Sequence, residues 1–203
     1  MVDETKLITE RLVLRPPEPA DLGAAMALLA DPVVTQFLLP GRRLTPEDAK
    51  DAFELTCARF SADGYGMFTV IQRSDGRIIG QAGLVVWNPE HWFRAAAAWL
   101  PGQKEVELGC IVDPRYWSKG YATECLAVVR DWALNELNLH RLIALVDPRN
   151  AAALRCAHRV GLSFERDVVI AGKERSLLAL AAVDQRDTVD ASGAENRSHV
   201  PYP

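Results

Sequence analysis

The stretch Ile111-Val-Asp-Pro-Arg-Tyr-Trp-Ser-Lys-Gly-Tyr-Ala-Thr-Glu124 decides the fold, because a strand ends here at a proline, turns through small and glycine residues, and opens a long helix. The first N–H groups of a helix have no internal partners, and the helix dipole adds partial positive charge at the same end. Gly120 lets the backbone approach a ligand without an intervening side chain. A lone glycine at such a turn is common in purely structural turns, so the prediction of a pyrophosphate site depends on the flanking sequence.

The sequence around this turn alternates between strand and helix patterns. Strands are predicted at Glu105–Val112, Arg141–Val146, Phe164–Ile170 and Glu174–Val183, and helices at Gly120–Leu137 and Asn150–Val160. Alternation of this kind implies parallel pairing in the second half of the chain, with antiparallel hairpins at the edges.

The first half of the chain predicts two helices and a hairpin. Its strands are expected at Arg11–Pro16, Gly66–Gln72 and Arg77–Val86, and its helices at Glu18–Ala30 and from Thr45 to Phe60. Thr45-Pro46-Glu47-Asp48 supplies an N-cap, a proline at the first helical position and early acidic residues. Ser74-Asp75-Gly76 has the composition of a hairpin turn. The two halves together predict a mixed α/β fold in one domain, residues 1–183.

Composition narrows the class of protein. Hydrophobic residues make up 49% of the 203 residues and charged residues 25%, as in a soluble globular domain. The net charge of -4 argues against direct nucleic-acid binding, because phosphates are neutralised by an excess of Lys and Arg. From Asp184 to Pro203 apolar residues become scarce, which predicts a disordered tail at 184–203.

The cysteines and the N-terminus indicate a cytoplasmic protein. Cys57, Cys110, Cys125 and Cys156 show no metal-ligand spacing, so neither a zinc site nor a disulfide framework is predicted. The N-terminus lacks the charged-then-apolar pattern of a signal peptide, and no stretch approaches the roughly twenty apolar residues of a membrane span. We therefore expect a cytoplasmic location, no membrane contact and no metal.

The run Trp117-Ser-Lys-Gly-Tyr-Ala-Thr-Glu124 resembles the acetyl-CoA motif of the GNAT acetyltransferases, in the ribosomal-protein N-acetyltransferase-like (RimJ/RimL-like) branch, whose usual form is W-G-x-G-Y-A-x-E. The similarity extends to Leu7–Arg15, to Asp147-Pro-Arg-Asn150 and to Arg159–Glu165, so that it spans about Leu7 to Val183. No dinucleotide-binding glycine motif, P-loop or serine-nucleophile elbow competes with it.

The resemblance implies a fold and an activity. The fold is a central mixed, mostly antiparallel sheet flanked by helices, with a parallel pair splayed at the cofactor site. The activity is transfer of an acetyl group from acetyl-CoA to a primary amine by direct attack in a ternary complex. In this branch the acceptor is the α-amine of a protein N-terminus, and a small-molecule amine is nearly as well supported. The sequence leaves a homodimer open.

The resemblance also assigns roles to single residues. The backbone amides of Ser118 to Thr123 would hold the pyrophosphate, and Ile111 and Val112 would pair with the pantetheine arm as an added strand does. Lys119 would meet a phosphate, although a solvated lysine is at least as common at a helix start. Asn150 would contact the pantetheine or only cap the following helix, two roles of equal weight. The whole cofactor-binding set is Cys110, Ile111, Val112, Trp117, Ser118, Lys119, Gly120, Tyr121, Ala122, Thr123 and Asn150.

Catalysis by an enzyme of this kind requires a neutral amine and a polarised thioester. Glu107 occupies the strand position where related enzymes carry the general base, and the competing interpretation is a residue that faces solvent or pairs with an arginine. The N–H of Val112 is the expected donor to the thioester oxygen. The chain departs from the family at the general acid, since Ala153 and Ala157 stand where related enzymes carry Ser and Tyr.

The missing general acid leaves three alternatives. The thiolate leaves without a dedicated donor, or water, Cys156 or His158 protonates it, or the protein is a non-catalytic acyl-CoA-binding or regulatory protein. His158 is also compatible with an ordinary position on the helix surface.

The segment Trp87–Gly102 is expected to be a long irregular insertion. It contains Trp87, Trp92, Phe93 and Trp99, which would form a wall or lid for the acceptor, or would cover a sheet edge or a subunit contact. The sequence does not place Glu90 in the site.

Overall fold

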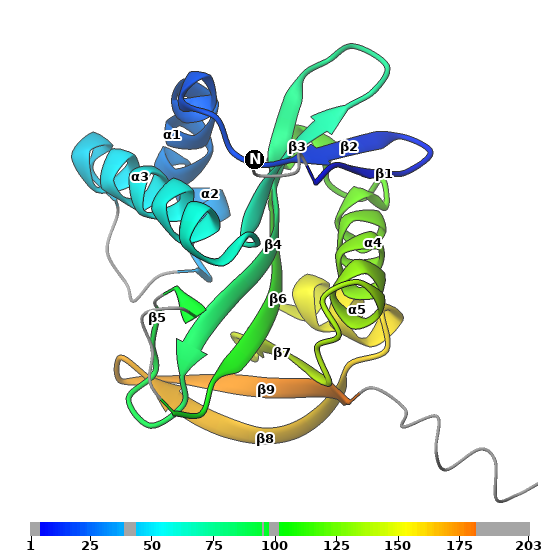
Figure 1. Cartoon of the computed structure of the whole chain (residues 1–203). Coiled ribbons are helices and arrows are strands. Elements are labelled where there is room, and N and C mark those ends of the chain that lie inside the picture. The colour runs from blue at the N-terminus through cyan, green and yellow to red at the C-terminus, as the bar shows by residue number, and fades with distance from the viewer. Residues whose placement is uncertain (1–4, 39–43, 95, 98–101, 182–203) are drawn as a thin grey trace, which may run out of the picture.

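The computed structural model describes residues 5–38, 44–94, 96–97 and 102–181, which form one mixed sheet with helices on both faces (Figure 1). The strands follow the order β1-β2-β3-β4-β6-β7-β9-β8, and β5 pairs with β4. The strands are β1 (Leu7–Ile8), β2 (Leu12–Arg15), β3 (Met67–Gln72), β4 (Ile78–Asn88), β5 (Phe93–Arg94), β6 (Glu105–Val112), β7 (Arg141–Val146), β8 (Ser163–Ile170) and β9 (Lys173–Ala181). The helices are η1 (Pro19–Asp21), α1 (Leu22–Ala30), α2 (Pro32–Thr35), α3 (Pro46–Asp63), η3 (Pro114–Tyr116), α4 (Tyr121–Asn135) and α5 (Ala151–Arg159).

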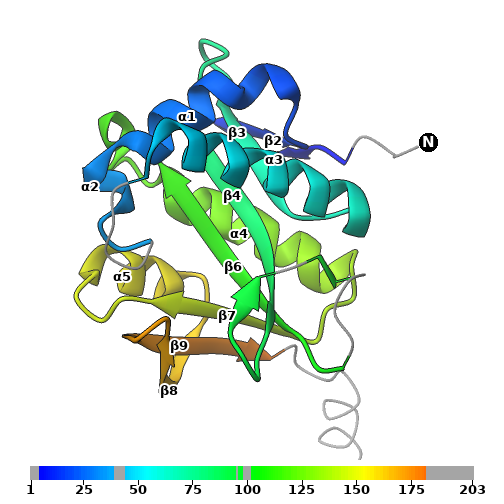
Figure 2. The ribbon, with the colours of Figure 1, turned by 90° about the vertical axis from the view of Figure 1, so that its left-hand side faces the viewer.

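The pair β6 and β7 is parallel, whereas the other pairs of described strands are antiparallel. The helix α4 carries the chain from the end of β6 back to the start of β7, which is the connection that a parallel pair needs. Glu107 pairs with Ile143, and beyond this point the two strands separate toward their carboxyl ends (Figure 2). The predicted mixed, mostly antiparallel sheet with a splayed parallel pair is confirmed.

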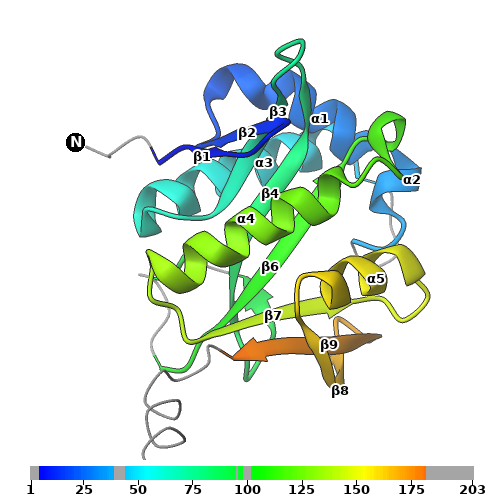
Figure 3. The same ribbon diagram turned by 90° about the vertical axis from the view of Figure 1, so that its right-hand side faces the viewer.

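Helices cover the two faces of the sheet differently. The helices α4 and α5 lie over one face (Figure 3), and α1, α2 and α3 lie over the other (Figure 2). Successive side chains of a strand point to opposite faces, and Leu108 packs in the core with Cys125 and Leu126 of α4. Glu107 and Ile111 therefore point to the face covered by α1, α2 and α3.

Most predicted elements are confirmed within a few residues. The strands β6 and β7 begin and end as expected, and α4 ends at Asn135, two residues before the expected end at Leu137. The helix α3 continues to Asp63 because Gly64, in the left-handed region at φ 73°, closes it by donating its N–H to the Phe60 carbonyl.

The prediction of an irregular insertion from Trp87 to Gly102 is wrong for its first part. Trp87 belongs to β4, and Phe93–Arg94 folds back as β5, with Trp87 opposite Arg94. The hydrophobic pattern missed this hairpin because two paired residues are too short to show a strand period. Trp99 and the tail at 184–203 lie outside the described residues.

In the part of the chain that the structure describes, no helix combines the length and apolar character needed to span a bilayer.

Candidate active site

The turn from β6 into α4 places glycine where its backbone is needed. Gly120 is the N-cap of α4 at φ 83°, and Ser118 also has a positive φ, 60°. The first main-chain hydrogen bond at the start of α4 runs from the Glu124 amide to the Gly120 carbonyl, at 3.0 Å. The amides of Tyr121, Ala122 and Thr123 therefore have no partner within the helix, and the turn that precedes them is exposed.

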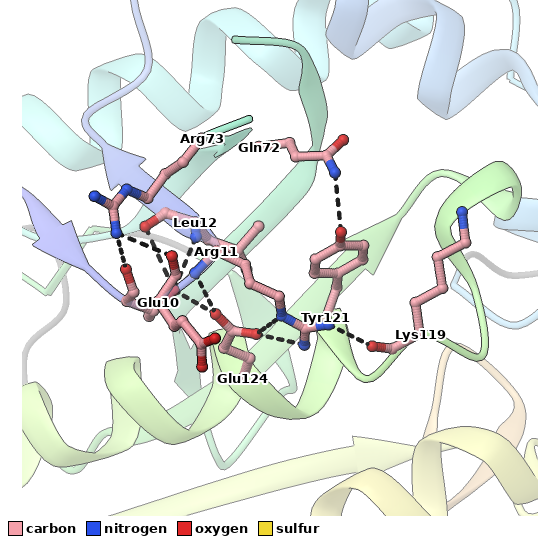
Figure 4. A network of polar contacts seen from close by, with 9 residues as sticks. Glu10, Arg11, Leu12, Gln72, Arg73, Lys119, Tyr121 and Glu124 are labelled. Carbon is pink, nitrogen blue, oxygen red and sulfur yellow. Dashed lines mark hydrogen bonds and ion pairs between the residues drawn. The ribbon is translucent and has the colours of Figure 1, made fainter. Parts of the chain in front are cut away.

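The glutamate of the motif fastens this turn to the N-terminal strands (Figure 4). The Glu124 carboxylate accepts hydrogen bonds from Arg11 Nε at 2.7 Å and from the Thr9 hydroxyl. Arg11 Nη1 also donates to the Lys119 carbonyl at 2.9 Å, and its guanidinium lies 4.4 Å from the centre of the Tyr121 ring. The sequence did not assign Arg11 to the site, because the contact spans more than a hundred residues of chain.

The remaining side chains of the motif have structural partners. Trp117 Nε1 donates to the Val112 carbonyl at 2.6 Å. Lys119 Nζ donates to the Arg115 carbonyl at 3.1 Å and is exposed. The Tyr121 hydroxyl accepts a hydrogen bond from Gln72 at 2.9 Å (Figure 4). These contacts shape the turn and leave the Lys119 ammonium at its surface.

After Glu107, one edge of β6 has no partner among the strands that the structure describes. The Asp113 amide donates to the Ile79 carbonyl. Along an antiparallel strand the N–H and C=O groups of successive residues point alternately to its two sides, so those of Ile111 also point to β4, where Gln81 is its partner. The N–H groups of Cys110 and Val112 point the other way, to the side where β7 has separated. The expectation that Ile111 and Val112 both face this edge is therefore wrong for the main chain of Ile111.

Glu107 lies where the two strands begin to part. Its Oε2 accepts a hydrogen bond from Trp87 Nε1 at 2.7 Å. Burial raises the pKa of the Glu107 carboxyl above its usual range, while the charge of Arg94, the Trp87 indole and the Leu145 amide oppose the rise. The residue as a whole is half-buried.

Gly109 opens the face of β6 beside Glu107. It stands two residues further along the strand and so shares the face of Glu107 and Ile111. A Cβ added at Gly109 would have no heavy atom within 4 Å. Space therefore exists between the carboxylate and the end of the strand.

The helix α5 forms the other side of the parted strands. The Asn150 Oδ1 accepts from the Ala153 amide at 3.1 Å, so Asn150 is the N-cap of α5. The Thr123 hydroxyl lies 3.7 Å from the Cys156 sulfur, which brings α4 and α5 into contact. His158 is exposed, and its Nδ1 lies 3.0 Å from the Leu162 carbonyl oxygen, at the end of the helix.

The described residues on the α1–α3 side of the sheet line at least two cavities. The larger, of about 330 Å³, is lined by residues that include Leu28, Gln81 and Asp113. The smaller, of about 60 Å³, lies under α3 and is lined by residues that include Arg59 and Arg94. No group of three or more His, Cys, Asp or Glu side chains suited to a metal ion occurs among the residues that the structure describes.

Comparison with known proteins identifies the family. A family model described as an acetyltransferase (GNAT) domain matches residues 11–163, more than half of the chain. The chain therefore belongs to the GNAT acetyltransferase family and is an acetyl-CoA-dependent N-acetyltransferase. The unpaired amides at the start of α4 and the partnerless edge of β6 fit this cosubstrate.

Similar proteins agree with this assignment. The uncharacterized N-acetyltransferase YnaD of Bacillus subtilis (strain 168) is 30% identical over 159 residues, which are 78% of this chain and 83% of that protein. An acetyltransferase from Agrobacterium tumefaciens str. C58 superimposes with a TM-score of 0.71 and 25% identity, covering 89% of this chain and 96% of that one. The spermidine N-acetyltransferase of Vibrio cholerae, solved with CoA and spermine, shares the fold at a TM-score of 0.66 and 18% identity, covering 85% and 96%.

Proposed function

We propose that this protein transfers the acetyl group of acetyl-CoA to a primary amine by direct attack in a ternary complex, with Glu107 as general base. The observation that carries the proposal is the position of the Glu107 carboxylate at the parting of β6 and β7, beside the open face at Gly109. An amine that enters over Gly109 comes within reach of both the carboxylate and the partnerless strand edge. A protein N-terminal α-amine and a small-molecule amine both satisfy this geometry.

The cosubstrate is proposed to bind along β6 and the start of α4. The main-chain amides of residues 118–123 would receive the pyrophosphate, with the dipole of α4 adding partial positive charge. Cys110 and Val112 would pair with the amides of the pantetheine arm, while the Ile111 main chain stays in the sheet. The same arm would meet the side-chain amide nitrogen of Asn150, whose oxygen caps α5.

The proposed chemistry follows from the groups at the parted strands. Acetyl-CoA supplies the reactive thioester carbon. The Glu107 carboxylate accepts the proton that the amine loses, directly or through a water, and its raised pKa makes it a stronger base than an exposed glutamate. The N–H of Val112 donates to the thioester oxygen and stabilises the negative charge that develops there. The new N–C bond forms as the C–S bond breaks.

The departing thiolate has no tyrosine or serine donor at the family positions, since Ala153 and Ala157 occupy them. Of the substitute donors considered, Cys156 is favoured over His158, because its sulfur lies beside Thr123 in the first turn of α4. His158 bonds at the far end of α5, which favours the view that it is an ordinary surface residue.

The test combines binding and turnover. Acetyl-CoA should raise the melting temperature, since a ligand that binds only the native state stabilises it. With a panel of amines, the enzyme should release thiol, and Glu107→Gln should lower kcat/KM at least about tenfold. Glu105→Gln, on the same strand but paired with Arg141, is the matched control and should keep most of the activity.

Two results would contradict the proposal. Unchanged kinetics in Glu107→Gln would remove Glu107 from the general-base role. Saturable acetyl-CoA binding without thiol release on any amine would favour the alternative of a non-catalytic acyl-CoA-binding or regulatory protein.

Four wider assignments are also proposed. The W-S-K-G-Y-A-T-E run at residues 117–124 supports the RimJ/RimL-like branch. The family match at residues 11–163 supports one acetyltransferase domain at 1–183. A cytoplasmic location and a homodimer remain predictions.

A further inference from the structure

Two arginines, Arg59 and Arg94, line a cavity next to Val85, the cross-strand neighbour of Glu107. Arg59 belongs to α3, and Arg94 belongs to β5, the short strand paired with the end of β4; both elements lie to the left of β4 in Figure 1. Neither forms an ion pair within the described part of the chain. By contrast, Arg141 pairs with two glutamates, and the buried Arg175 pairs with an aspartate. Arginines held beside a site without a carboxylate are suited to bind one from a ligand.

Arg59 carries a donor that the protein itself does not satisfy. Its Nη2 donates to the Arg94 carbonyl at 3.0 Å, which joins α3 to β5. Its Nε is buried and has no hydrogen-bond partner among the described residues. An unsatisfied buried donor is costly, and the cost falls when a ligand supplies an acceptor.

Arg94 is connected to the proposed general base through one side chain. Its guanidinium lies 4.7 Å from the centre of the Trp87 ring, and the Trp87 indole donates to Glu107 at 2.7 Å. The stacked indole fixes the guanidinium relative to the carboxylate. The Arg94 side chain is exposed, so it is accessible to a ligand that approaches Glu107.

The two arginines line a small cavity together with residues of β4. It measures about 60 Å³ and is lined by Arg59, Arg94 and Val85, and Val85 is the cross-strand partner of Glu107. One water needs about 10–15 Å³ of such volume, so the cavity holds a group of a few heavy atoms. Neighbouring strands lie about 4.8 Å apart, which places the cavity roughly one strand from Glu107.

The charge of this cavity favours an anion. Asp63 also lines it, but the Asp63 Oδ2 accepts a hydrogen bond from the Ala97 amide at 2.6 Å. Two guanidinium groups against one carboxylate leave a positive balance in the lining of the cavity, which does not include Glu107.

We infer that the acceptor is an amine that carries a carboxylate a few bonds from its nitrogen, and that Arg94 and Arg59 bind this carboxylate while the nitrogen lies at Glu107. The inference rests on the proposed function and specifies its substrate class. The carboxylate has two sources, the α-carboxylate of a free amino acid or the acidic side chain of the first residue of a peptide. A polyamine lacks a group for the arginines and is repelled by them.

The test compares pairs of amines that differ only in whether they carry the negatively charged carboxylate. An amino acid is matched with its amide, and a peptide that begins with Asp or Glu is matched with one that begins with Asn or Gln. Kinetics are measured for the wild type, Arg94→Gln and Arg94→Lys, with Arg77→Gln, an exposed arginine in the β3–β4 turn region, as control. At least one carboxylate-bearing amine should exceed its neutral partner by about tenfold or more in kcat/KM.

The variants should then separate the charge from other roles of Arg94. Arg94→Gln should remove most of this preference, Arg94→Lys should restore part of it, and Arg77→Gln should retain it. Equal kcat/KM for charged and neutral partners, or a preference that survives in Arg94→Gln, would overturn the inference.

A binding measurement distinguishes failure of the inferred carboxylate recognition from failure of the proposed acetyltransferase function. In the presence of CoA, the N-acetylated form of each amino acid is titrated against the wild type and Arg94→Gln by calorimetry. Weaker binding to Arg94→Gln supports the inference even without turnover. Efficient acetylation of polyamines, dependent on Glu107 and with no effect of Arg94→Gln, would overturn the inference and leave the proposed function standing.

Discussion

Replacing Gly109 with alanine adds a methyl group to the open face of β6, between Glu107 and the strand edge proposed to hold the thioester. The added Cβ meets no heavy atom within 4 Å, and the backbone φ of Gly109 is not in the left-handed region. A glycine replaced by alanine without strain stabilises a protein by about 0.4–1 kcal/mol, because the unfolded chain loses freedom. For a chain of this size, each kcal/mol raises the Tm by about 2–4 °C.

The same methyl group should obstruct the amine. A displacement of about 1 Å at the reacting atoms costs on the order of 10²-fold in rate, so we expect kcat/KM of Gly109→Ala to fall by about that factor while the Tm rises. Thiol release and a thermal melt measure the two quantities. Gly23→Ala is the matched control, since its Cβ also meets open space, in α1, and it should raise the Tm without loss of activity. Wild-type kcat/KM in Gly109→Ala would refute entry of the amine over this face.

Three further predictions concern charged and thiol groups. Arg149 and then Arg175 hold the pKa of Asp147 far below its usual range, so its contribution to stability is complete above the unfolded pKa of about 3.9 and is lost as the pH falls. Asp147→Asn should therefore cost about 3–5 kcal/mol at pH 7 in urea unfolding, because Arg175 stays buried without its charge partner, and a loss below 1 kcal/mol would contradict this. Since the pKa of Glu107 is raised in the folded protein, kcat/KM should increase with pH through that pKa, and this limb should be absent in Glu107→Gln. Burial raises the pKa of Cys110 to about 12, so mass spectrometry after iodoacetamide treatment at pH 8 should find Cys110 unmodified until denaturant is added.

The local sequence predicted the elements because their signals are local. A capping box at Thr45 and Asp48, with a proline between them, begins α3 as expected. Asn150 begins α5 with its side chain on the Ala153 amide, the structural one of the two roles considered for it. Such signals lie within a few residues of the boundary that they set, so one sequence suffices to read them.

The site was predicted in part for the same reason. The turn at Gly120 was found because its conformation and its free amides come from contiguous residues. The partners of Glu107 were not found, because Trp87 reaches it across a strand pair and Arg94 reaches Trp87 through a two-residue strand. The direction of the Ile111 main chain was also misjudged, since it depends on the register between β4 and β6.

The sequence by itself determined which segments form strands and helices, where the anion-binding turn lies, and the family resemblance that these features carry. The tertiary structure alone decided the rest: that Arg11 from the first strands fastens the turn through Glu124, that the edge of β6 after Glu107 has no partner among the described strands, and that Arg59 and Arg94 meet beside the proposed base. Secondary structure follows from nearest neighbours along the chain. The meeting of distant side chains follows from strand register and helix packing, which only the assembled sheet fixes.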